Sequence, residues 1–476
     1  MMLDQSQNGS NIFNDPKLPH LAAVMDEGLM AEHFARHLRA ASPGLEWQVA
    51  QCVIENVIYK PAKHCRLLYR LALRHPSGAA AEEWFYGQLY PAGLAEKRFD
   101  DAVSSVKHSY VAHDFLKKLP PVSFWPDLSM VLWMFPQDPN MAGLPYLFDP
   151  LFVRQHVESN LRALGAVENG AGPGWRCADI RCDRVKYMPG KRCVLRYHAQ
   201  LSGPAGQSRE MTFYSKTYSD AMSRYYFQFL RTVYEQLIAQ TAAVHLPKPL
   251  LHLDGLNTFW QEDWRGTSLS SVLDELDWDD IFPRVGRALA AWHGVRVTDL
   301  PNGPDPDDVL KMTEEYAIKL VDKMPVLQPL IGAALERLKA ARATLDSQQI
   351  PAVPIHGAIR PSQMLVRGNE LALVDLDDIA LGDPLFDVAE FIVSVQYSEI
   401  RIKRPRQKIT RAVDLFLRHY AEQVPWPCDR RRLAWYAVAF LINKMCSSVK
   451  HRDVSILQQL ESTGQELVNG WLEFIS

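Results

Sequence analysis

The sequence of 476 residues lacks a hydrophobic run long enough to cross a bilayer. Its longest apolar run, LAWYAVAFLI at 433–442, is about half the ~20 residues that a membrane-spanning helix needs. We therefore interpret this run as a buried helix. The first residues, MMLDQSQNGSN, are polar and contain no apolar segment of the kind found in a secretory signal. A membrane partner is not expected.

Paired cysteines and a charge excess are also missing. The seven cysteines are scattered without a C-x-x-C pair, and Cys177 and Cys182 are too isolated to predict a zinc site. This pattern favours a reduced, cytoplasmic compartment. The net charge of −3 gives no general attraction to nucleic acid, and no aromatic and basic module is present. A nucleic-acid partner is therefore not expected either.

The bulk composition is that of a globular protein. Hydrophobic residues make up 47% of the chain and charged residues 22%. The length is sufficient for two or three domains.

A long internal repeat is the first positive feature of the chain. Residues 57–99 align without a gap with residues 185–227, at a shift of 128, and 15 of the 43 aligned positions are identical. Upstream, Asp15-Pro16 matches Asp138-Pro139 at a shift of 123. Two copies are too few for a solenoid, so we interpret the repeat as the tandem duplication of one module.

The repeat suggests a division of the chain into four parts. We expect a polar tail at 1–14, a first module at 15–137, a second module at 138–265 and a mainly helical part at 266–476. Each module begins with an amphipathic helix, marked in the first by Leu29, Phe34, His37 and Leu38. Runs rich in β-branched and aromatic residues follow and predict strands.

The segment 353–388 contains the most informative pattern. His356-Gly357 opens a loop, and two short apolar strands follow, joined by a Gly-Asn turn. The second strand ends at Asp375, and Asp383-Pro384 and Asp387 precede a helix. A loop and a hairpin that bring a polar residue and a carboxylate together suit phosphates and Mg²⁺. The alternative is an ordinary hairpin with aspartates in its turns.

This segment resembles the catalytic and metal-binding segment of the aminoglycoside phosphotransferase and choline kinase family. Two positions depart from the family's pattern, because Ala358 replaces the catalytic aspartate and Gln363 replaces the metal-binding asparagine. The matching positions are His356, Gly357, Asp375, Gly382, Asp383, Pro384 and Asp387.

The resemblance implies an α+β, protein-kinase-like fold of two lobes, here preceded by a second copy of the small lobe. It also implies ATP and Mg²⁺ as cofactors, with Gln363 and Asp375 as metal ligands. The amide oxygen of Gln363 can still reach the ion from one methylene further out. His356, Arg360 and the degenerate base position Ala358 would form the catalytic loop.

Three interpretations of Ala358 remain open. The chain could be a natural pseudokinase, could use another base such as Asp377 or Asp378, or could be an inactive variant made by engineering. A general base contributes about 10²–10⁴-fold in rate. Because phosphoryl transfer depends mostly on positioning and charge neutralisation, the change weakens transfer without necessarily abolishing it.

The second module contains the residues that the resemblance assigns to nucleotide binding. Lys216 occupies the place of the lysine that pairs with the α- and β-phosphates, and Glu235 is a candidate partner for it. The alternative for Lys216 is a solvated strand lysine. The remaining candidates are the adenine-binding hinge Gln261, Glu262 and Asp263, and the phosphate turn with Gly190, Lys191 and Arg192.

The phosphate turn is unusual because Gly190 is its only glycine, so Lys191 and Arg192 would supply charge instead. The alternative is a plain basic hairpin tip. In the first module Gln88 stands at the position of Lys216, and no His-Gly segment follows it before the second module. We expect the first module to bind no nucleotide and to serve as a cap, a docking surface for a protein partner or the surface of a homodimer.

Two functions are consistent with these residues. One is an ATP- and Mg²⁺-dependent phosphotransferase that acts on a small hydroxylated molecule with weakened, altered or silenced activity. The other is a pseudokinase that binds nucleotide or a protein partner as a regulator or scaffold. A basic stretch argues mildly for an anionic or neutral phosphate acceptor over an aminoglycoside, although a solvated helix end is the alternative. It comprises Arg401, Lys403, Arg404, Arg406 and Lys408.

Overall fold

The computed structural model describes residues 15–42, 46–166, 174–345, 350–449 and 454–475. The expected polar tail, 1–14, lies outside the described residues. The chain divides into two compact units. The first comprises Met1–Phe227 with Pro249–Asp263, and the second comprises Gln228–Lys248 with Trp264–Ser476.

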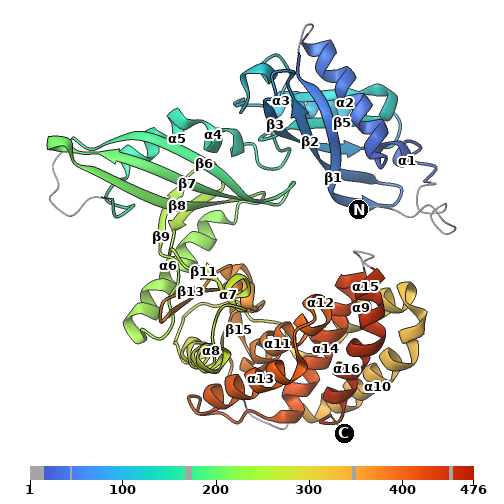
Figure 1. Cartoon of the computed structure of the whole chain (residues 1–476), viewed down its shortest axis with the longest axis vertical. Coiled ribbons are helices and arrows are strands. Elements are labelled where there is room, and N and C mark those ends of the chain that lie inside the picture. Colours follow the sequence, from blue (N-terminus) through green and yellow to red (C-terminus); the bar gives the residue numbers. More distant parts are fainter. Residues whose placement is uncertain (1–14, 43–45, 167–173, 346–349, 450–453, 476) are drawn as a thin grey trace. The chain divides into compact units, whose positions relative to one another are not determined.

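The first unit contains two five-stranded antiparallel sheets, drawn in blue and green in Figure 1. The first sheet has the strand order β1-β2-β3-β5-β4. Its strands are β1 (Gln48–Lys60), β2 (His64–Arg74), β3 (Ala80–Leu89), β4 (Val122–Trp125) and β5 (Met130–Met134). Helices α1 (Leu21–Val24), α2 (Glu27–Ala41) and α3 (Ala95–Ser105) accompany it.

Alternation of side chains along the strands lets this sheet bury both faces. Phe34 of α2 packs against Tyr69 and Phe85 on one face. Ala102 of α3 belongs to a separate cluster with Tyr86 on the other face. The predicted helix at the start of the first module is present, but Leu29 is exposed and Met30 is buried instead, because the helical period aligns residues 30, 34 and 38 on the buried face.

The second sheet has the equivalent order β6-β7-β8-β10-β9. Its strands are β6 (Arg176–Met188), β7 (Arg192–Ser202), β8 (Ser208–Tyr218), β9 (Pro249–Leu253) and β10 (Thr258–Glu262). Helices α4 (Leu144–Phe148) and α5 (Pro150–Ser159) pack on it, and α6 (Ser223–Gln240) follows β8. The bounds of β6 and β7 lie 128 residues after those of β1 and β2.

In each sheet, an aspartate carboxylate holds the turn between the first two strands. The side chain of Asp15 accepts hydrogen bonds from the Tyr59 hydroxyl at 2.9 Å and from the Ala62 amide at 2.7 Å. In the second half the corresponding bonds, at 2.8 Å and 2.7 Å, join Asp138 to Tyr187 and Gly190. One sequence pattern thus folds in the same way twice.

The second unit is mainly helical, with two small sheets. Its helices are α7 (Leu269–Val272), α8 (Trp278–His293), α9 (Pro306–Lys323), α10 (Gln328–Leu345), α11 (Pro384–Gln396), α12 (Ser398–Ile402), α13 (Arg406–Ala421), α14 (Arg430–Val449), α15 (Val454–Gln459) and α16 (Gln465–Leu472). One sheet contains β11 (Thr267–Ser268), β13 (Met364–Arg367) and β14 (Glu370–Leu373), and the other contains β12 (Val353–Ile355) and β15 (Ala380–Gly382).

The α+β class and the order of a strand-rich lobe before a helical lobe, as in protein-kinase-like folds, agree with the prediction. The predicted buried helix at 433–442 is part of α14, and its residues Leu433 to Ala439 are buried. None of the helices in the described part of the chain combines the length and the hydropathy that a bilayer crossing demands.

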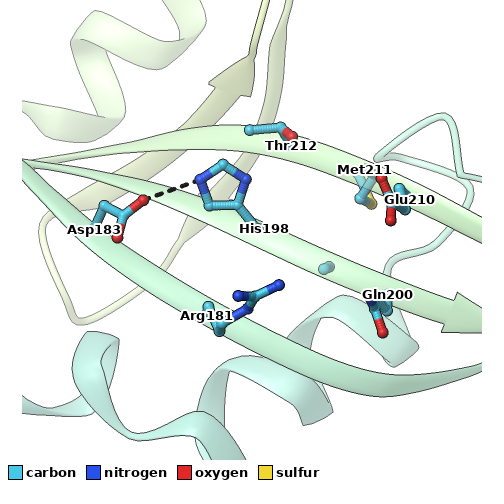
Figure 2. A pocket seen from close by; sticks show the side chains of 8 residues that line it. Arg181, Asp183, His198, Gln200, Glu210, Met211 and Thr212 are labelled. Carbon is cyan, nitrogen blue, oxygen red and sulfur yellow. Dashed lines mark hydrogen bonds and ion pairs between the residues drawn. The ribbon is translucent and has the colours of Figure 1, made fainter.

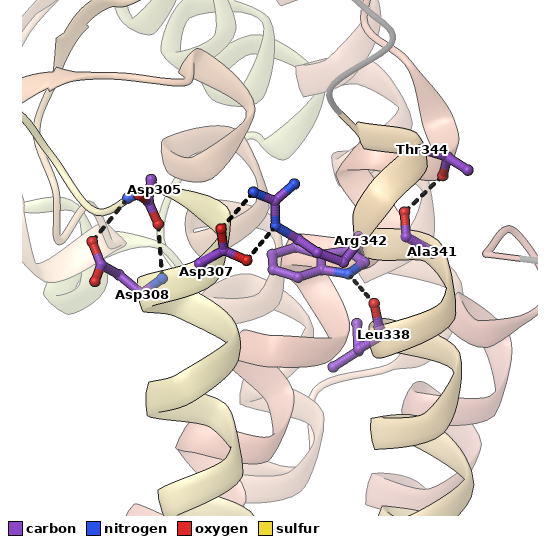
Figure 3. A network of polar contacts seen from close by, with 8 residues as sticks. Asp305, Asp307, Asp308, Leu338, Ala341, Arg342 and Thr344 are labelled. Atoms are coloured by element: carbon purple, nitrogen blue, oxygen red, sulfur yellow. Dashed lines mark hydrogen bonds and ion pairs between the residues drawn. The ribbon is translucent and has the colours of Figure 1, made fainter.

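Helices α9, α10 and α14 are joined by polar contacts at their ends (Figure 3). Asp305 caps α9, and Asp307 accepts two hydrogen bonds of 2.8 Å from Arg342 of α10. The indole of Trp435 in α14 donates to the backbone carbonyl of Leu338 at 2.9 Å. These contacts fix the helical scaffold behind the segment 353–388.

A pair of glycine substitutions tests the helix packing. In Gly286→Ala, the new Cβ of α8 would meet the Phe416 carbonyl oxygen of α13 at 2.5 Å, so overpacking should cost about 1–3 kcal/mol. Gly332→Ala on α10 is the matched control, because nothing lies within 4 Å of its Cβ, and it should stabilise by about 0.4–1 kcal/mol. Thermal unfolding should show shifts of opposite sign, and equal shifts would contradict the close approach of α8 and α13.

Candidate functional site

The loop at His356 and Gly357 is held by one buried carboxylate. Asp387, on α11, is fully buried, and its side chain accepts hydrogen bonds from the His356 amide at 2.6 Å and the Gly357 amide at 3.0 Å. His293 of α8 is also buried, and its Nε2 lies 3.2 Å from the same carboxylate. Its Nδ1 lies 2.7 Å from the hydroxyl of Tyr420. The loop is therefore tied to α8, α11 and α13 together.

Only glycine fits at position 357. Its φ is +78°, and an added Cβ would lie 2.2 Å from the carbonyl oxygen of Asp378. Ala358 follows, half-buried, and its methyl group cannot accept a proton. Arg360, further along the loop, is exposed. The loop is therefore shaped by Gly357, and position 358 offers no carboxylate.

The hairpin β13–β14 brings the two predicted metal ligands to one end. The Val374 amide donates to the Gln363 carbonyl at 3.0 Å, and the His356 ring nitrogen Nε2 lies 2.9 Å from the Val374 carbonyl oxygen. Asp375 is the next residue and adopts a left-handed conformation with φ of 64°. Gln363, Asp375 and the loop at His356 are therefore neighbours.

The chemistry of these two side chains fits a hard cation. Gln363 is 7% exposed, and within the described residues its Oε1 has no hydrogen-bond partner. The described parts of the chain contain no cluster of three or more His, Cys, Asp or Glu side chains arranged for a metal. Mg²⁺ does not require one, because it is usually held by one or two carboxylates together with substrate phosphates and water.

Lys216 lies near the end of β8, paired with Val194 of β7 and Phe259 of β10. It is 7% exposed, so the alternative of a solvated strand lysine does not describe it. The equivalent residue of the first sheet, Gln88, is buried to the same extent.

The other predicted nucleotide-binding residues occupy different environments. Glu235 on α6 is exposed, and Arg231 lies 3.9 Å from its carboxylate. Gln261 and Glu262 end β10, and the carboxylate of Asp263 accepts a hydrogen bond from Arg196 at 2.7 Å. The Asp263 side chain is therefore engaged within its own sheet.

The turn between β6 and β7 is more constrained than a flexible phosphate loop. The Gly190 amide donates to the buried carboxylate of Asp138, and Asn140 donates to the Gly190 carbonyl at 3.2 Å. Lys191 is exposed and Arg192 is half-buried. Because the Gly190 amide already donates to Asp138, this turn would attract a phosphate through the positive charges of Lys191 and Arg192.

Two of the five residues of the basic stretch 401–408, Arg404 and Arg406, form ion pairs within the second unit. Arg404 donates two hydrogen bonds to Asp274, at 3.0 and 2.9 Å. Arg406 pairs with Glu399 and Glu466. These contacts weaken the expectation that the stretch selects an anionic acceptor.

A cavity of about 250 Å³ lies on the outer face of the second sheet (Figure 2). Residues of β6, β7 and β8 line it, and His198 pairs with Asp183 there at 3.0 Å. None of the predicted site residues lines this cavity. At the equivalent place in the first sheet, Arg70 pairs with Glu55 and Glu82, so we interpret the feature as a charged sheet face.

Comparison with known proteins gives one family match. The model of the phosphotransferase enzyme family matches residues 197–422, which include Lys216 and the whole segment 353–388. Residues 197–422 are thus similar to the phosphotransferase enzyme family. No curated protein has a matching sequence.

Solved structures similar to the chain include kinases of small molecules. Amicoumacin kinase hAmiN, in complex with AMP-PNP and Ca²⁺, has 12% identity and a TM-score of 0.38, over 61% of this chain and 87% of that one. A thermostable mutant of aminoglycoside phosphotransferase APH(4)-Ia, with ADP and hygromycin B, has 15% identity and a TM-score of 0.41, over 68% and 98%. A choline/ethanolamine kinase family protein from Mesorhizobium loti has 13% identity and a TM-score of 0.37, over 67% and 92%.

Two buried carboxylates of α11 have surroundings that the sequence did not reveal. Asp387 was matched to the family pattern, but its hold on the loop amides follows only from the structure. Glu390 was not predicted at all, although it is a single charge in the apolar run that follows Asp387 and could have been found by that contrast.

The hold of Asp387 on the loop can be tested by Asp387→Asn. The variant keeps the shape of the side chain but presents an NH₂ group to one of the donors, and each orphaned buried group costs about 1–3 kcal/mol. Thermal unfolding should show a marked loss of stability, whereas Asp414→Asn, at an exposed position of α13, should change little. Equal stability of the two variants would show that the carboxylate does not organise the loop.

Proposed function

We propose that this chain is an ATP- and Mg²⁺-dependent phosphotransferase that acts on a small hydroxylated molecule with weakened catalysis. One observation carries the proposal: Asp387 holds the loop of His356 and Gly357 next to the hairpin end where Gln363 and Asp375 lie. This arrangement lies inside the segment that matches the phosphotransferase family.

Each proposed role follows from the chemistry of the side chain. Asp375 and Gln363 would hold Mg²⁺ through carboxylate and amide oxygens. The ion supplies neutralisation of the charge on the phosphates. Lys216 would pair with the α- and β-phosphates, and His356 keeps the loop aligned through the Val374 carbonyl. Backbone groups of Gln261 to Asp263 would contact adenine.

The alternative function is a pseudokinase, and Ala358 is the observation that favours it. A pseudokinase would bind nucleotide or a protein partner without transferring phosphate. The two functions differ in whether phosphate leaves ATP, since both allow nucleotide binding.

We further propose that residues 15–137 are a duplicated small lobe without a nucleotide site. The uncharged amide of Gln88 replaces Lys216, which removes the phosphate partner. Arg184 of β6 stacks on Trp84 of the first sheet, 3.7 Å from the ring centroid, and lies 5.2 Å from Phe135. These contacts support a docked cap, whose outer surface is available to a protein partner or to a second copy of the chain.

Thermal stability with Mg·ATP is the primary test of the nucleotide site. At 100 times its dissociation constant, a ligand should stabilise the folded protein by about 2.7 kcal/mol. We expect this metal-dependent shift to vanish in Asp375→Asn and to persist in Asp322→Asn, an exposed carboxylate on α9. Absence of a shift in the unmodified chain would contradict nucleotide binding.

The internal repeat provides a control position for Lys216, because Gln88 occupies the equivalent place in the first sheet. Lys216→Met should abolish the Mg·ATP shift because the phosphates lose their cationic partner, whereas Gln88→Met, at the equivalent buried position of the first sheet, should preserve it. Isothermal titration of both variants measures the affinities directly. Equal loss in both variants would indicate that the first sheet takes part in binding.

Restoring the base separates the enzyme from the pseudokinase. Ala358→Asp should raise phosphate release from Mg·ATP, by as much as about 10²–10⁴-fold where no other group in the chain already serves as the general base. Ala358→Asn, of similar size but without a basic carboxylate, is the control and should not. If Ala358→Asp releases no phosphate although Mg·ATP still stabilises it against unfolding, the pseudokinase is favoured.

A further inference from the structure

A second carboxylate lies one helical turn beyond the one that holds the loop. Glu390 follows Asp387 by three residues on α11, and residues at this spacing are neighbours on a helix surface. Glu390 is 9% exposed, and its Oε2 has no hydrogen-bond partner among the described residues. A buried carboxylate oxygen without a partner is costly, so its position calls for a functional explanation.

The groups around Glu390 place it beside the loop. Its charged neighbours come from four elements: Lys444 on α14, Asp387 on α11, Arg360 in the loop and Asp378 in the turn after β14. The same turn contacts the loop, since the Asp378 carbonyl lies against Gly357. The Glu390 carboxylate therefore shares its electrostatic environment with the loop that contains Ala358.

We propose that Glu390 is the catalytic base of this chain, in place of the carboxylate that Ala358 lacks. The proposal rests on the proposed function. The acceptor O–H bond breaks and its proton passes to the Glu390 carboxylate, while the acceptor oxygen forms a bond to the γ-phosphorus of ATP. The bond from that phosphorus to the bridging oxygen breaks, and ADP leaves with the electron pair.

The protonation behaviour of Glu390 suits a base at moderately alkaline pH. Burial raises the pKa of Glu390 to about 8, with Asp387 and Asp378 acting in the same direction and Lys444 and Arg360 opposing them. Burial also lowers the pKa of Lys444. Below pH 8 the carboxyl is mostly protonated and cannot accept a proton, so the rate should rise as the pH passes through this value.

The experiment measures phosphate release from Mg·ATP with water as the acceptor, in the full chain. Four proteins are compared: the unmodified chain, Glu390→Gln, Ala358→Asp and the double variant. Glu390→Gln should lower the rate about 10²-fold or more in the unmodified chain but only slightly beside Ala358→Asp, where a second base is present. Glu422→Gln, an exposed carboxylate at the end of α13, is the control and should leave the rate unchanged.

The pH profile gives a second, independent readout. The unmodified chain should show a rate that rises with an apparent pKa near 8, and Glu390→Gln should remove this rise. An equal loss of rate in both backgrounds, or a flat profile in the unmodified chain, would overturn the proposal by indicating a structural role. So would silence of the unmodified chain towards ATP.

The failure of the proposed function is distinguishable from the failure of this assignment. If Mg·ATP does not stabilise the unmodified chain, the nucleotide site is absent and the base assignment fails with it. If Mg·ATP stabilises the unmodified chain and Glu390→Gln equally but the rates do not differ, only the base assignment fails.

Discussion

The buried carboxylate of Asp387 is the interaction on which the site depends. A charge removed from water is tolerated only where hydrogen bonds replace its hydration, and here two loop amides and a histidine do so. The requirement is mutual, because the amide of His356 is itself buried and needs an acceptor, and the amide of Gly357 is partly buried. These contacts fix helices α8, α11 and α13 relative to the loop at His356. The hairpin β13–β14 is positioned in turn by its contact with that loop.

The same device occurs in the first unit. Asp15 and Asp138 each hold the turn after the first strand of their sheet through a tyrosine hydroxyl and a backbone amide. In the second sheet this uses the amide of Gly190, which a glycine-rich loop would otherwise leave free for phosphate. The turn is therefore held by hydrogen bonds to its backbone and presents basic side chains in place of a free glycine amide.

Motifs were easier to predict from the sequence than the contacts that position them. The hairpin around Gly368 and the buried helix at 433–442 follow from local pattern, because periodicity and turn residues are encoded within a few positions. The roles of Asp387 and Glu390 depend on residues that are tens of positions away, which no local pattern contains.

The cost of the site argues against a purely structural role for this region. Asp375 is held in a left-handed conformation that is rare for residues other than glycine, at about 1–3 kcal/mol. Buried oxygens of Gln363 and Glu390 have no partner in the described structure, and each costs a similar amount. A scaffold would gain stability by losing all three features. On the proposed function, a cation would be the partner that the oxygen of Gln363 lacks, and an acceptor hydroxyl would be the partner that the oxygen of Glu390 lacks.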